Sequence, residues 1–392
     1  MKPFILILSF CSLFILTPQN ARANDGRFFT EGNQLLPILE TDICLNREVL
    51  TITLTDNGWA EVDVIYTLFN PSNEKNICVG FEAPIPGGAV SSEYNPLGIH
   101  PYIKDFIVEV NNATTPFKNA VTSAWSKNKR TTFQQLDTTE WKIQDDEVGT
   151  LYNIKIDSCI EYSYTYYFQA QFKPGINTLH HHYRYLMSES VGYAFGLDYR
   201  LSPAIRWANH QIDDFSLIIR CPNTAKHFTV NDFGIKSDTL FQVIEGVGKT
   251  RRRSICTGDS KCEITEISLR NGAIRYHCVN FCPNTELEIV SGDNCALYQY
   301  DQDGNYVDRT VPFGFFYDRG PTQQLILKQE GCTKRIQRNL PYAHRGYVFK
   351  DKKLQQYFDK LWWYMPDATY KPTNKDFTPY EKERLSKKSN KL

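Results

Sequence analysis

This sequence contains little methionine, has no net charge and lacks the common catalytic signatures. Only 3 of the 392 residues are Met, and 44 Lys plus Arg balance 44 Asp plus Glu. The metalloprotease, serine-hydrolase, phosphate-loop and dinucleotide-binding patterns are missing. Scattered carboxylates can still meet in space, so these absences disfavour an enzyme without excluding one. We expect no cofactor and no nucleic acid partner.

Long apolar runs are missing after residue 23. Residues 4–16 are almost wholly apolar, Lys2 gives a positive start, and residues 21–23 fit small-x-small cleavage. The run is too short for a comfortable membrane-spanning helix, which needs about twenty residues. We therefore expect a signal peptide at 1–23, followed by an exported chain without a membrane span. The expected location is secreted, in the periplasm or at the cell surface.

Cysteine, in contrast, is frequent, with ten residues after the expected cleavage point. An even number in an exported chain indicates a disulfide framework, because the compartment is oxidising. The pairing stays open. A zinc site at His277, Cys278 and Cys282 is disfavoured because the spacing does not repeat the short Cys-x-x-Cys knuckle, and we expect no metal. The disulfide candidates are Cys44, Cys78, Cys159, Cys221, Cys256, Cys262, Cys278, Cys282, Cys295 and Cys332.

Composition and hydropathy favour β-structure. Aromatic residues make up 14% of the chain, and Tyr, Phe, Val, Ile and Thr favour pleated, half-buried surfaces. Residues 50–55 and 60–68 alternate in polarity around Asn57-Gly58, a strong hairpin signal. Asn271-Gly272 and Asp303-Gly304 mark two further turns. Other strands are expected at 106–110, 162–168, 215–219, 264–269, 273–276, 297–300 and 306–307.

Charge is divided unevenly along the chain. Residues 333–392 hold 15 Lys plus Arg and 6 Asp plus Glu, a net of +9, whereas residues 24–332 hold 27 and 38, a net of −11. This split marks a boundary near Cys332, and the basic run at 249–253 indicates an exposed loop. We predict a mainly β fold of sandwich-like antiparallel domains with a small C-terminal α-helical module. The expected divisions are signal peptide 1–23, β-rich region 24–250 of one or two subdomains, Cys-rich β subdomain 254–332, helical module 333–386 and basic tail 387–392.

The last sixty residues have a helical pattern. Asp351 is a suitable N-cap. A second capping pattern, with Pro at the first helical position, is present at 378–381. The apolar stripe of an amphipathic helix follows the first cap, at Leu354, Tyr357, Phe358, Leu361 and Trp362.

The same block resembles a known family. Its signature residues are Tyr342-Ala343-His344-Arg345-Gly346-Tyr347, with Arg338-Asn339 before them and Phe349-Lys350-Asp351 and Trp362-Trp363-Tyr364 after them. Over 333–386 the block is similar to the YARHG domain, a small module of secreted bacterial proteins. The resemblance implies an exported protein and places 342–347 at the turn before the helix. Two features depart from the family pattern: His precedes Arg, and Pro341 stands where relatives continue a helix.

A second, more diffuse resemblance covers the N-terminal half. Residues 66–70, 80–84, 172–175 and 201–208 are similar to an exported bacterial β-rich family of unknown function. This resemblance implies sheet architecture and supplies no catalytic residues.

Cationic and aromatic side chains coincide in the C-terminal module. Aromatic faces suit sugar rings and ammonium groups suit carboxylate or phosphate, which indicates peptidoglycan or another anionic envelope glycan as the partner. In the competing interpretation, the aromatic residues form the core of a small module and the lysines form its solvated face. The candidate binding residues are Tyr342, His344, Arg345, Tyr347, Lys350, Lys352, Trp363 and Tyr364.

Two metal-like patterns have structural explanations. His180-His181-His182 lies in a strand pattern, so only His180 and His182 can share a face, and no carboxylate or cysteine is close in sequence. Residues 301–305 resemble a calcium loop faintly, but the Gly comes one position early and no Glu closes the loop. A strand and a hairpin turn are the expected structures.

Three functions are compatible with these features. A non-catalytic cell-envelope protein whose basic module binds an anionic surface glycan is favoured. A periplasmic or surface hydrolase, with the module as a targeting appendage, requires buried titratable groups that converge in one pocket. A protein-interaction subunit requires an exposed strand edge such as 162–168. The oligomeric state stays open.

Overall fold

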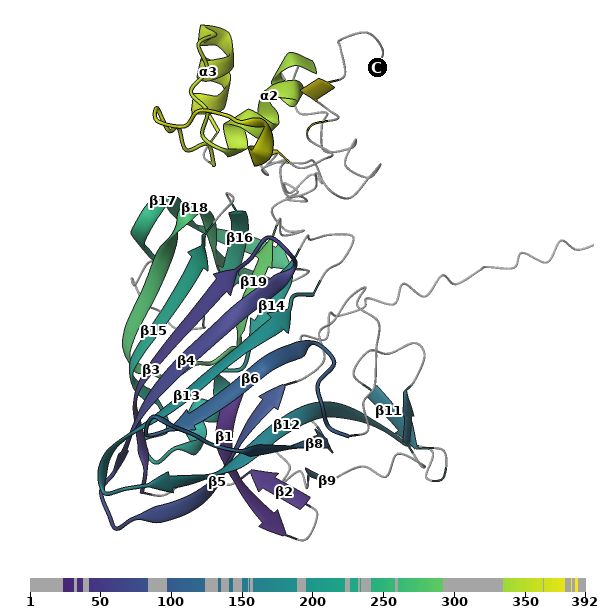
Figure 1. Ribbon diagram of the computed structural model, residues 1–392, viewed down its shortest axis with the longest axis vertical. Helices are drawn as coiled ribbons and strands as arrows, with labels where there is room; N and C mark the ends of the chain where they lie inside the picture. The colour runs from purple at the N-terminus through teal and green to yellow at the C-terminus, as the bar shows by residue number, and fades with distance from the viewer. Residues whose placement is uncertain are drawn as a thin grey trace, which may run out of the picture.

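The computed structural model contains two β-sheets and a small helical module at one end (Figure 1). The prediction of a mainly β fold with a C-terminal α-helical module is confirmed. No helix within the described residues is both long and apolar enough to cross a membrane. The structure describes residues 24–31, 34–37, 42–83, 97–123, 133–134, 141–143, 150–153, 155, 158–188, 195–222, 226–231, 233, 241–257, 260–291, 334–361, 363–377, 382 and 385–386.

In this described part, the first sheet has eight strands, all paired antiparallel. Their order is β10-β11-β12-β5-β1-β2-β9, and β8 also pairs with β12. The strands are β1 (Asn24–Glu31), β2 (Gln34–Pro37), β5 (Lys75–Ala83), β8 (Phe117–Ser123), β9 (Phe133–Gln134), β10 (Trp141–Ile143), β11 (Thr150–Asn153) and β12 (Ser158–Phe172).

The second sheet has eleven strands within the same residues, in the order β14-β19-β16-β18-β15-β3-β4-β13-β6-β7, and β17 also pairs with β18. Its pairs are antiparallel apart from β3 and β15, which are parallel. The strands are β3 (Cys44–Leu54), β4 (Trp59–Asn70), β6 (Ile103–Val110), β7 (Ala113–Thr114), β13 (Gly175–Leu186), β14 (Gly196–Tyr199), β15 (Ile212–Cys221), β16 (Lys226–Asn231), β17 (Gln242–Thr257), β18 (Ser260–Phe281) and β19 (Leu287–Ser291), and a short 3-10 helix, η1 (Ser202–Arg206), follows β14.

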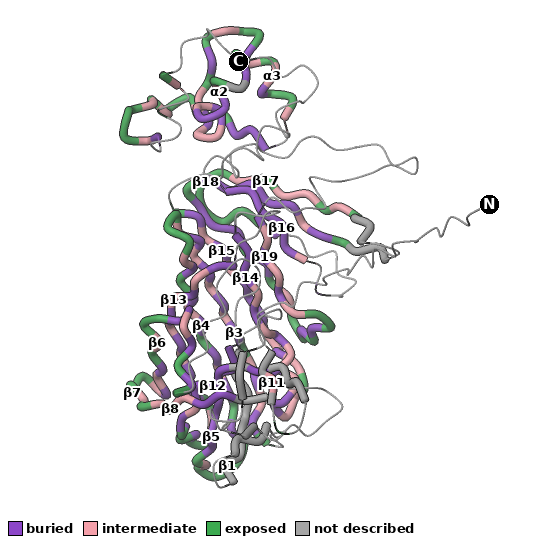
Figure 2. The backbone as a smooth tube through the Cα atoms, turned by 90° about the vertical axis from the view of Figure 1, so that its right-hand side faces the viewer, coloured by how far each residue is buried: buried purple, intermediate pink, exposed green. Residues whose placement is uncertain are grey.

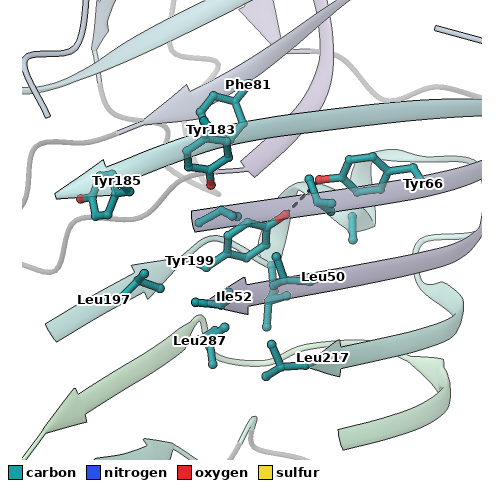
Figure 3. Close-up of a cluster of buried hydrophobic side chains, with 14 of the residues drawn as sticks. Leu50, Ile52, Tyr66, Phe81, Tyr183, Tyr185, Leu197, Tyr199, Leu217 and Leu287 are labelled. Atoms are coloured by element: carbon teal, nitrogen blue, oxygen red, sulfur yellow. Dashed lines mark hydrogen bonds between the residues drawn. The ribbon is translucent and has the colours of Figure 1, made fainter. Parts of the chain in front are cut away.

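The core lies between the two sheets. Alternation of apolar and polar residues in β3 and β4 buries one face of each strand. The Phe81 ring of the first sheet lies 5.0 Å from the Tyr183 ring of the second. Within this core the hydroxyl groups of Tyr66 and Tyr199 lie 3.0 Å apart (Figure 3). Interdigitated aromatic side chains therefore make the sandwich that the composition predicted.

The predicted hairpin at Asn57-Gly58 is confirmed, because β3 and β4 pair antiparallel across it. The predicted hairpin at Asn271-Gly272 is wrong. Strand β18 runs unbroken through this dipeptide, pairing with β16 before it and with β15 after it. A Cβ atom on Gly272 would lie 2.1 Å from the Glu245 carbonyl oxygen on β17. The absence of a side chain at Gly272 therefore allows the β17 backbone to approach closely. This contact lies at an irregularity in the β17–β18 pairing, where β18 also changes its other partner from β16 to β15.

The predicted domain boundary between 250 and 254 falls inside β17. Residues 249–253, expected as a loop, are paired with β18. The arginines in this run are held in the strand by a buried acid, since Arg251 and Arg253 both form ion pairs with Glu266. The 24–250 region and the Cys-rich region therefore share one sheet.

Five of the predicted disulfide cysteines are free thiols: Cys44, Cys78, Cys221, Cys278 and Cys282. Burial raises the pKa of Cys221 to about 12 and that of Cys78 to about 11. These two thiols lie in different sheets as small apolar side chains of the interior. The structure therefore shows no disulfide at these five positions, and the predicted framework stays a prediction.

The remaining disulfide candidates lie outside the side chains that the structure describes: Cys159, Cys256, Cys262, Cys295 and Cys332. The signal peptide 1–23, the strands and turn at 297–307, the capping pattern at 378–381 and the tail 387–392 also lie outside the described residues.

A buried ion pair joins the two sheets. Glu82 of β5 is fully buried and accepts two hydrogen bonds from Arg206 of η1, each 3.0 Å long. Arg200 donates a third, 2.6 Å long. We predict that Glu82→Gln lowers the free energy of unfolding by about 3–5 kcal/mol, because it leaves the buried Arg206 charge uncompensated. Urea unfolding measures this loss.

The matched control is Glu245→Gln. Glu245 also accepts two hydrogen bonds from one arginine, Arg220, at 2.7 and 3.1 Å, but this pair is exposed. The control should leave the urea midpoint unchanged, since solvent screens exposed pairs. Equal effects of the two substitutions would contradict the prediction.

Candidate functional site

The C-terminal module has its own hydrophobic core. It contains α2 (Lys334–His344), α3 (Lys352–Asp359) and the short 3-10 helix η4 (Asn374–Asp376). As predicted, Asp351 caps α3 and accepts hydrogen bonds from the backbone N–H groups of Lys353 and Leu354. Helix α2 continues through Pro341 and does not end there. The core consists of Ile336, Leu340, Ala343, Phe349, Leu354, Phe358, Trp363 and Tyr364.

The signature residues hold this module together. The His344 ring stacks on Trp363 with ring centres 4.5 Å apart and planes 8° apart. Arg345 donates a 2.8 Å hydrogen bond to the Pro341 carbonyl and lies 4.8 Å from the centre of the Phe377 ring. Gly346 has φ +77°, a left-handed conformation that glycine adopts readily, at the turn that follows α2.

The eight candidate binding residues have different degrees of exposure. Lys350 and Lys352 are exposed, whereas Tyr342, His344, Arg345 and Tyr347 are half-buried. Trp363 is 4% exposed and Tyr364 is 2% exposed. The core interpretation therefore fits Trp363 and Tyr364 better than ligand contact does, and we no longer assign these two residues to binding. Trp362 lies outside the described residues.

The module packs on one face of the second sheet, at the end formed by β16, β17 and β18 (Figure 1). Three successive carbonyl oxygens, of residues 363–365, accept hydrogen bonds from this face. Their donors are the Ser268 hydroxyl at 3.4 Å, the Lys249 ammonium at 2.9 Å and the Arg270 guanidinium at 2.8 Å. We call Lys249, Ser268, Arg270 and the adjacent His227 the docking face. Sequence reasoning missed this face, because the basic run of β17 was interpreted as a loop.

The docking face is polar, and apart from the exposed Lys249 it is buried. His227, Ser268 and Arg270 are 3%, 4% and 6% exposed, and Glu266 beside them is 1% exposed. Figure 2 shows buried residues on β16 and β18 at this end of the sheet. A buried polar surface needs partners to offset lost hydration. The hydrogen bonds and ion pairs of this layer supply such partners for Glu266, for Ser268 and for Nη1 of Arg270.

Two histidines lie in this layer with depressed pKa values. Burial, then the charges of Arg251, His344 and Arg253, lower the pKa of His227 to about 3. Burial and Arg345 lower the pKa of His344 to about 3. His344 is half-buried as a residue, whereas His227 is 3% exposed, so we expect His227 to have the larger effect.

The His180–His182 strand is confirmed, with only His181 buried. On the outer face of this strand, the fold places carboxylates that are distant from the histidines in the sequence. His180 lies 2.8 Å from Asp63 and 3.4 Å from Glu109, and His182 lies 3.6 Å from Asp63. Among the described residues, no group of three His, Cys, Asp or Glu is arranged to hold a metal ion. The absence of a resident metal stays a prediction.

The buried carboxylates of the described residues are dispersed. Glu48 accepts a hydrogen bond from Tyr199 at 3.3 Å, Glu82 pairs with Arg200 and Arg206, and Glu266 pairs with Arg251 and Arg253. Each belongs to a different strand and is bonded there. This dispersal gives no support to the hydrolase hypothesis, which requires convergent titratable groups.

The strand proposed for edge pairing is not an edge. Residues 162–168 of β12 pair with β8 on one side, and residues 164–172 pair with β5 on the other. Residues 164–168 are therefore paired on both sides, so this part of the strand offers no open edge and gives the protein-interaction hypothesis no support.

We predict that acid weakens the fold through His227. Its pKa is near 6.5 in the unfolded chain and about 3 in the folded one. The folded pKa is the lower one, so this stability is complete above pH 6.5 and is lost as pH falls toward 3. The free energy of unfolding, measured by urea titration, should decline from pH 6.5 to 5. The contribution of His227 to this decline is up to about 1.4 kcal/mol per pH unit.

The His227→Gln variant should have a shallower pH dependence over this interval, whatever its stability at pH 7. The control is His277→Gln, because His277 lies exposed beside Asp214. An unchanged slope in the His227 variant would rule out this origin of acid sensitivity.

Comparison with known proteins places the module in a family. The YARHG domain matches residues 320–390. No curated protein matches the chain. Among solved structures, the chain is similar to a Legionella pneumophila protein provisionally named as nutrient binding, with TM-score 0.47 and 17% identity over 94% of this chain and 98% of that one.

Two other similar structures are more distant. They are an M1 zinc metallopeptidase from Deinococcus radiodurans (TM-score 0.26, 10% identity, 65% of this chain and 43% of that one) and baculovirus P35 (TM-score 0.24, 7% identity, 64% and 97%). We draw no functional conclusion from these three likenesses. The family match, the signature at 342–347 and the two short helices show that this β-rich chain carries a YARHG domain at its C-terminal end, which points to an extracellular or envelope protein.

Proposed function

We propose that this chain is an exported, non-catalytic cell-envelope protein whose YARHG module binds an anionic surface glycan such as peptidoglycan. The observation that carries the proposal is the exposed cationic face of α3. We define this face as Lys350, Lys352, Lys353 and Lys360, all of which are exposed. Lys352 and Lys353 open α3, Lys350 precedes its N-cap and Lys360 is its C-cap, so the four exposed lysines lie on and directly beside one short helix.

Two acids of the module have local roles, and Asp359 is the one exposed acid within α3 beside its lysines. Asp351 caps α3 and pairs with Arg335 at 2.6 Å. Asp376 is held by Thr373, which lowers its pKa. The ion pair between the two parts, Arg270 with Asp367 at 3.7 Å, uses a cation of the body and an acid of the module. This ion pair between the body and the module therefore neutralises an acid of the module, and it involves none of the α3 lysines.

Charged polymers suit such a surface better than small neutral ligands do. Each exposed Lys contributes modestly, so affinity requires several contacts along one chain. Salt screens exposed charges beyond about 8 Å at physiological ionic strength. Binding through α3 should consequently weaken as salt rises.

We predict that Lys352, Lys353 and Lys360→Gln together lower retention of the full chain on purified peptidoglycan about tenfold. This estimate assumes ~0.5 kcal/mol for each exposed charge and about 1.4 kcal/mol for each factor of ten. Sedimentation with peptidoglycan at low and high salt measures the retained fraction. The high-salt fraction should be low for wild type and variant alike.

The control variant carries Lys104, Lys118 and Lys173→Gln. These three lysines are exposed on the body, so the control has the same net charge as the α3 variant. It should retain wild-type binding. Equal losses in both variants, or retention that is indifferent to salt, would sink the proposal.

A further inference from the structure

We propose that the YARHG module contains a guanidinium-binding socket, formed by Gly346, Met365 and Asp367, which Arg270 of the body fills. Arg270 projects from β18, and its side chain is 7% exposed. Its Nη1 atom donates a 2.8 Å hydrogen bond to the Met365 carbonyl oxygen. Its Nη2 atom lies 3.7 Å from the Asp367 carboxylate. The proposal goes beyond glycan binding, because it assigns a second ligand chemistry to the module.

Gly346 provides the space for the guanidinium. A Cβ atom at this position would lie 1.6 Å from Nη1 of Arg270 and 2.4 Å from the Met365 carbonyl oxygen. Any side chain here would therefore displace the guanidinium. The φ of +77° independently disfavours other residues. The signature glycine thus has two roles, chain reversal and admission of Arg270.

The walls of the socket are fixed by hydrogen bonds within the module. The Asp367 backbone N–H donates to the Gly346 carbonyl at 2.7 Å, and Tyr347 and Asp367 form a parallel bridge. The Tyr364 hydroxyl donates to the Tyr347 carbonyl at 2.7 Å. Two segments separated by some twenty residues are thereby joined around the site. A socket held in this way loses little entropy when it is filled.

The charge of the socket suits a cation. Hydrogen bonds from Thr369 lower the pKa of Asp367, so its carboxylate is ionised near neutral pH. The Met365 carbonyl adds a neutral acceptor. Burial works against the Arg270 charge, while Asp367 supports it. A buried cation of this kind requires both partners to offset its lost hydration.

The geometry favours guanidinium over ammonium. The planar guanidinium presents donors on two nitrogens in a fixed fork, so one group can face a carbonyl and a carboxylate together. The Lys249 ammonium, in comparison, is bonded to the Tyr364 carbonyl at the exposed margin of the docking face. The two basic residues therefore have different positions, and Arg270 occupies the enclosed one.

Chemical rescue of Arg270→Ala in the full chain tests the socket. Amide hydrogen exchange in residues 342–376 should become roughly ten- to hundredfold faster, the effect of losing a charge-assisted hydrogen bond. Millimolar ethylguanidinium, which replaces the missing atoms, should restore protection in this segment. Ethylammonium at the same concentration should not. Arg275→Ala is the matched control, because Arg275 is exposed on the same strand and should give neither loss nor rescue.

Asp367→Asn provides a second variant in case Arg270→Ala does not fold. This substitution keeps the Met365 carbonyl and the space at Gly346 and removes only the carboxylate charge of residue 367. Amide hydrogen exchange in residues 342–376 should therefore rise, but by a smaller factor than in an Arg270→Lys variant, which loses the guanidinium group. Ethylguanidinium should not protect it further, since Arg270 still fills the socket. Rescue by ethylammonium, no rescue of Arg270→Ala, or normal protection in the Asp367 variant would overturn the proposal.

Discussion

The hydrogen-bonded layer between the helical module and the sheet is the constraint on which the rest of this structure depends. Its members, His227, Glu266, Ser268 and Arg270, are all buried, and three of them are ionisable. Such groups can leave water only if each meets a partner with the correct charge and geometry. Arg251 and Arg253 of β17 supply the partners of Glu266, and backbone carbonyl groups of the module accept from Ser268 and Arg270. This requirement restricts where the module can lie on the sheet.

The small size of the module explains why its aromatic residues are used internally. A unit of about fifty residues buries too little surface to be stable without large side chains or a supporting surface. Here Phe349, Phe358 and Trp363 fill the interior, and the sheet bonds the backbone that follows α3. The proposed ligand contact is consequently left to exposed side chains, of which lysine is the commonest type among the described residues of the module. The same need for internal contacts explains why His344 and Arg345 of the signature pack against residues of the module.

Much of the fold followed from local sequence patterns, whereas the candidate site did not. The hairpin at Asn57-Gly58, the strand at 175–186 and the cap at Asp351 were predictable because each depends on neighbouring residues. Asn271-Gly272 was misassigned because a bulge and a hairpin use the same residues, and only the partner strand decides between them. Arg251 and Arg253 were placed in a loop because Glu266 is distant enough in sequence to hide the pairing. The contact of Arg270 with Gly346 joins residues that no local pattern connects.

The distribution of charge along the molecule gives the proposed glycan contact a direction. The sequence assigns −11 to residues 24–332 and +9 to residues 333–392. The module lies at one end of the long axis, beside the basic strand β17 (Figure 1). Screening limits these fields to about 8 Å at physiological salt, so an anionic surface responds to the nearest charges and not to the total. Arg251 and Arg253 of β17 are paired with Glu266, so the exposed lysines on and beside α3 make this end positive on a chain of zero net charge. In the proposed glycan contact, an anionic wall would attract this end and repel the acidic remainder of the body, which favours end-on binding with the sandwich directed away from the wall.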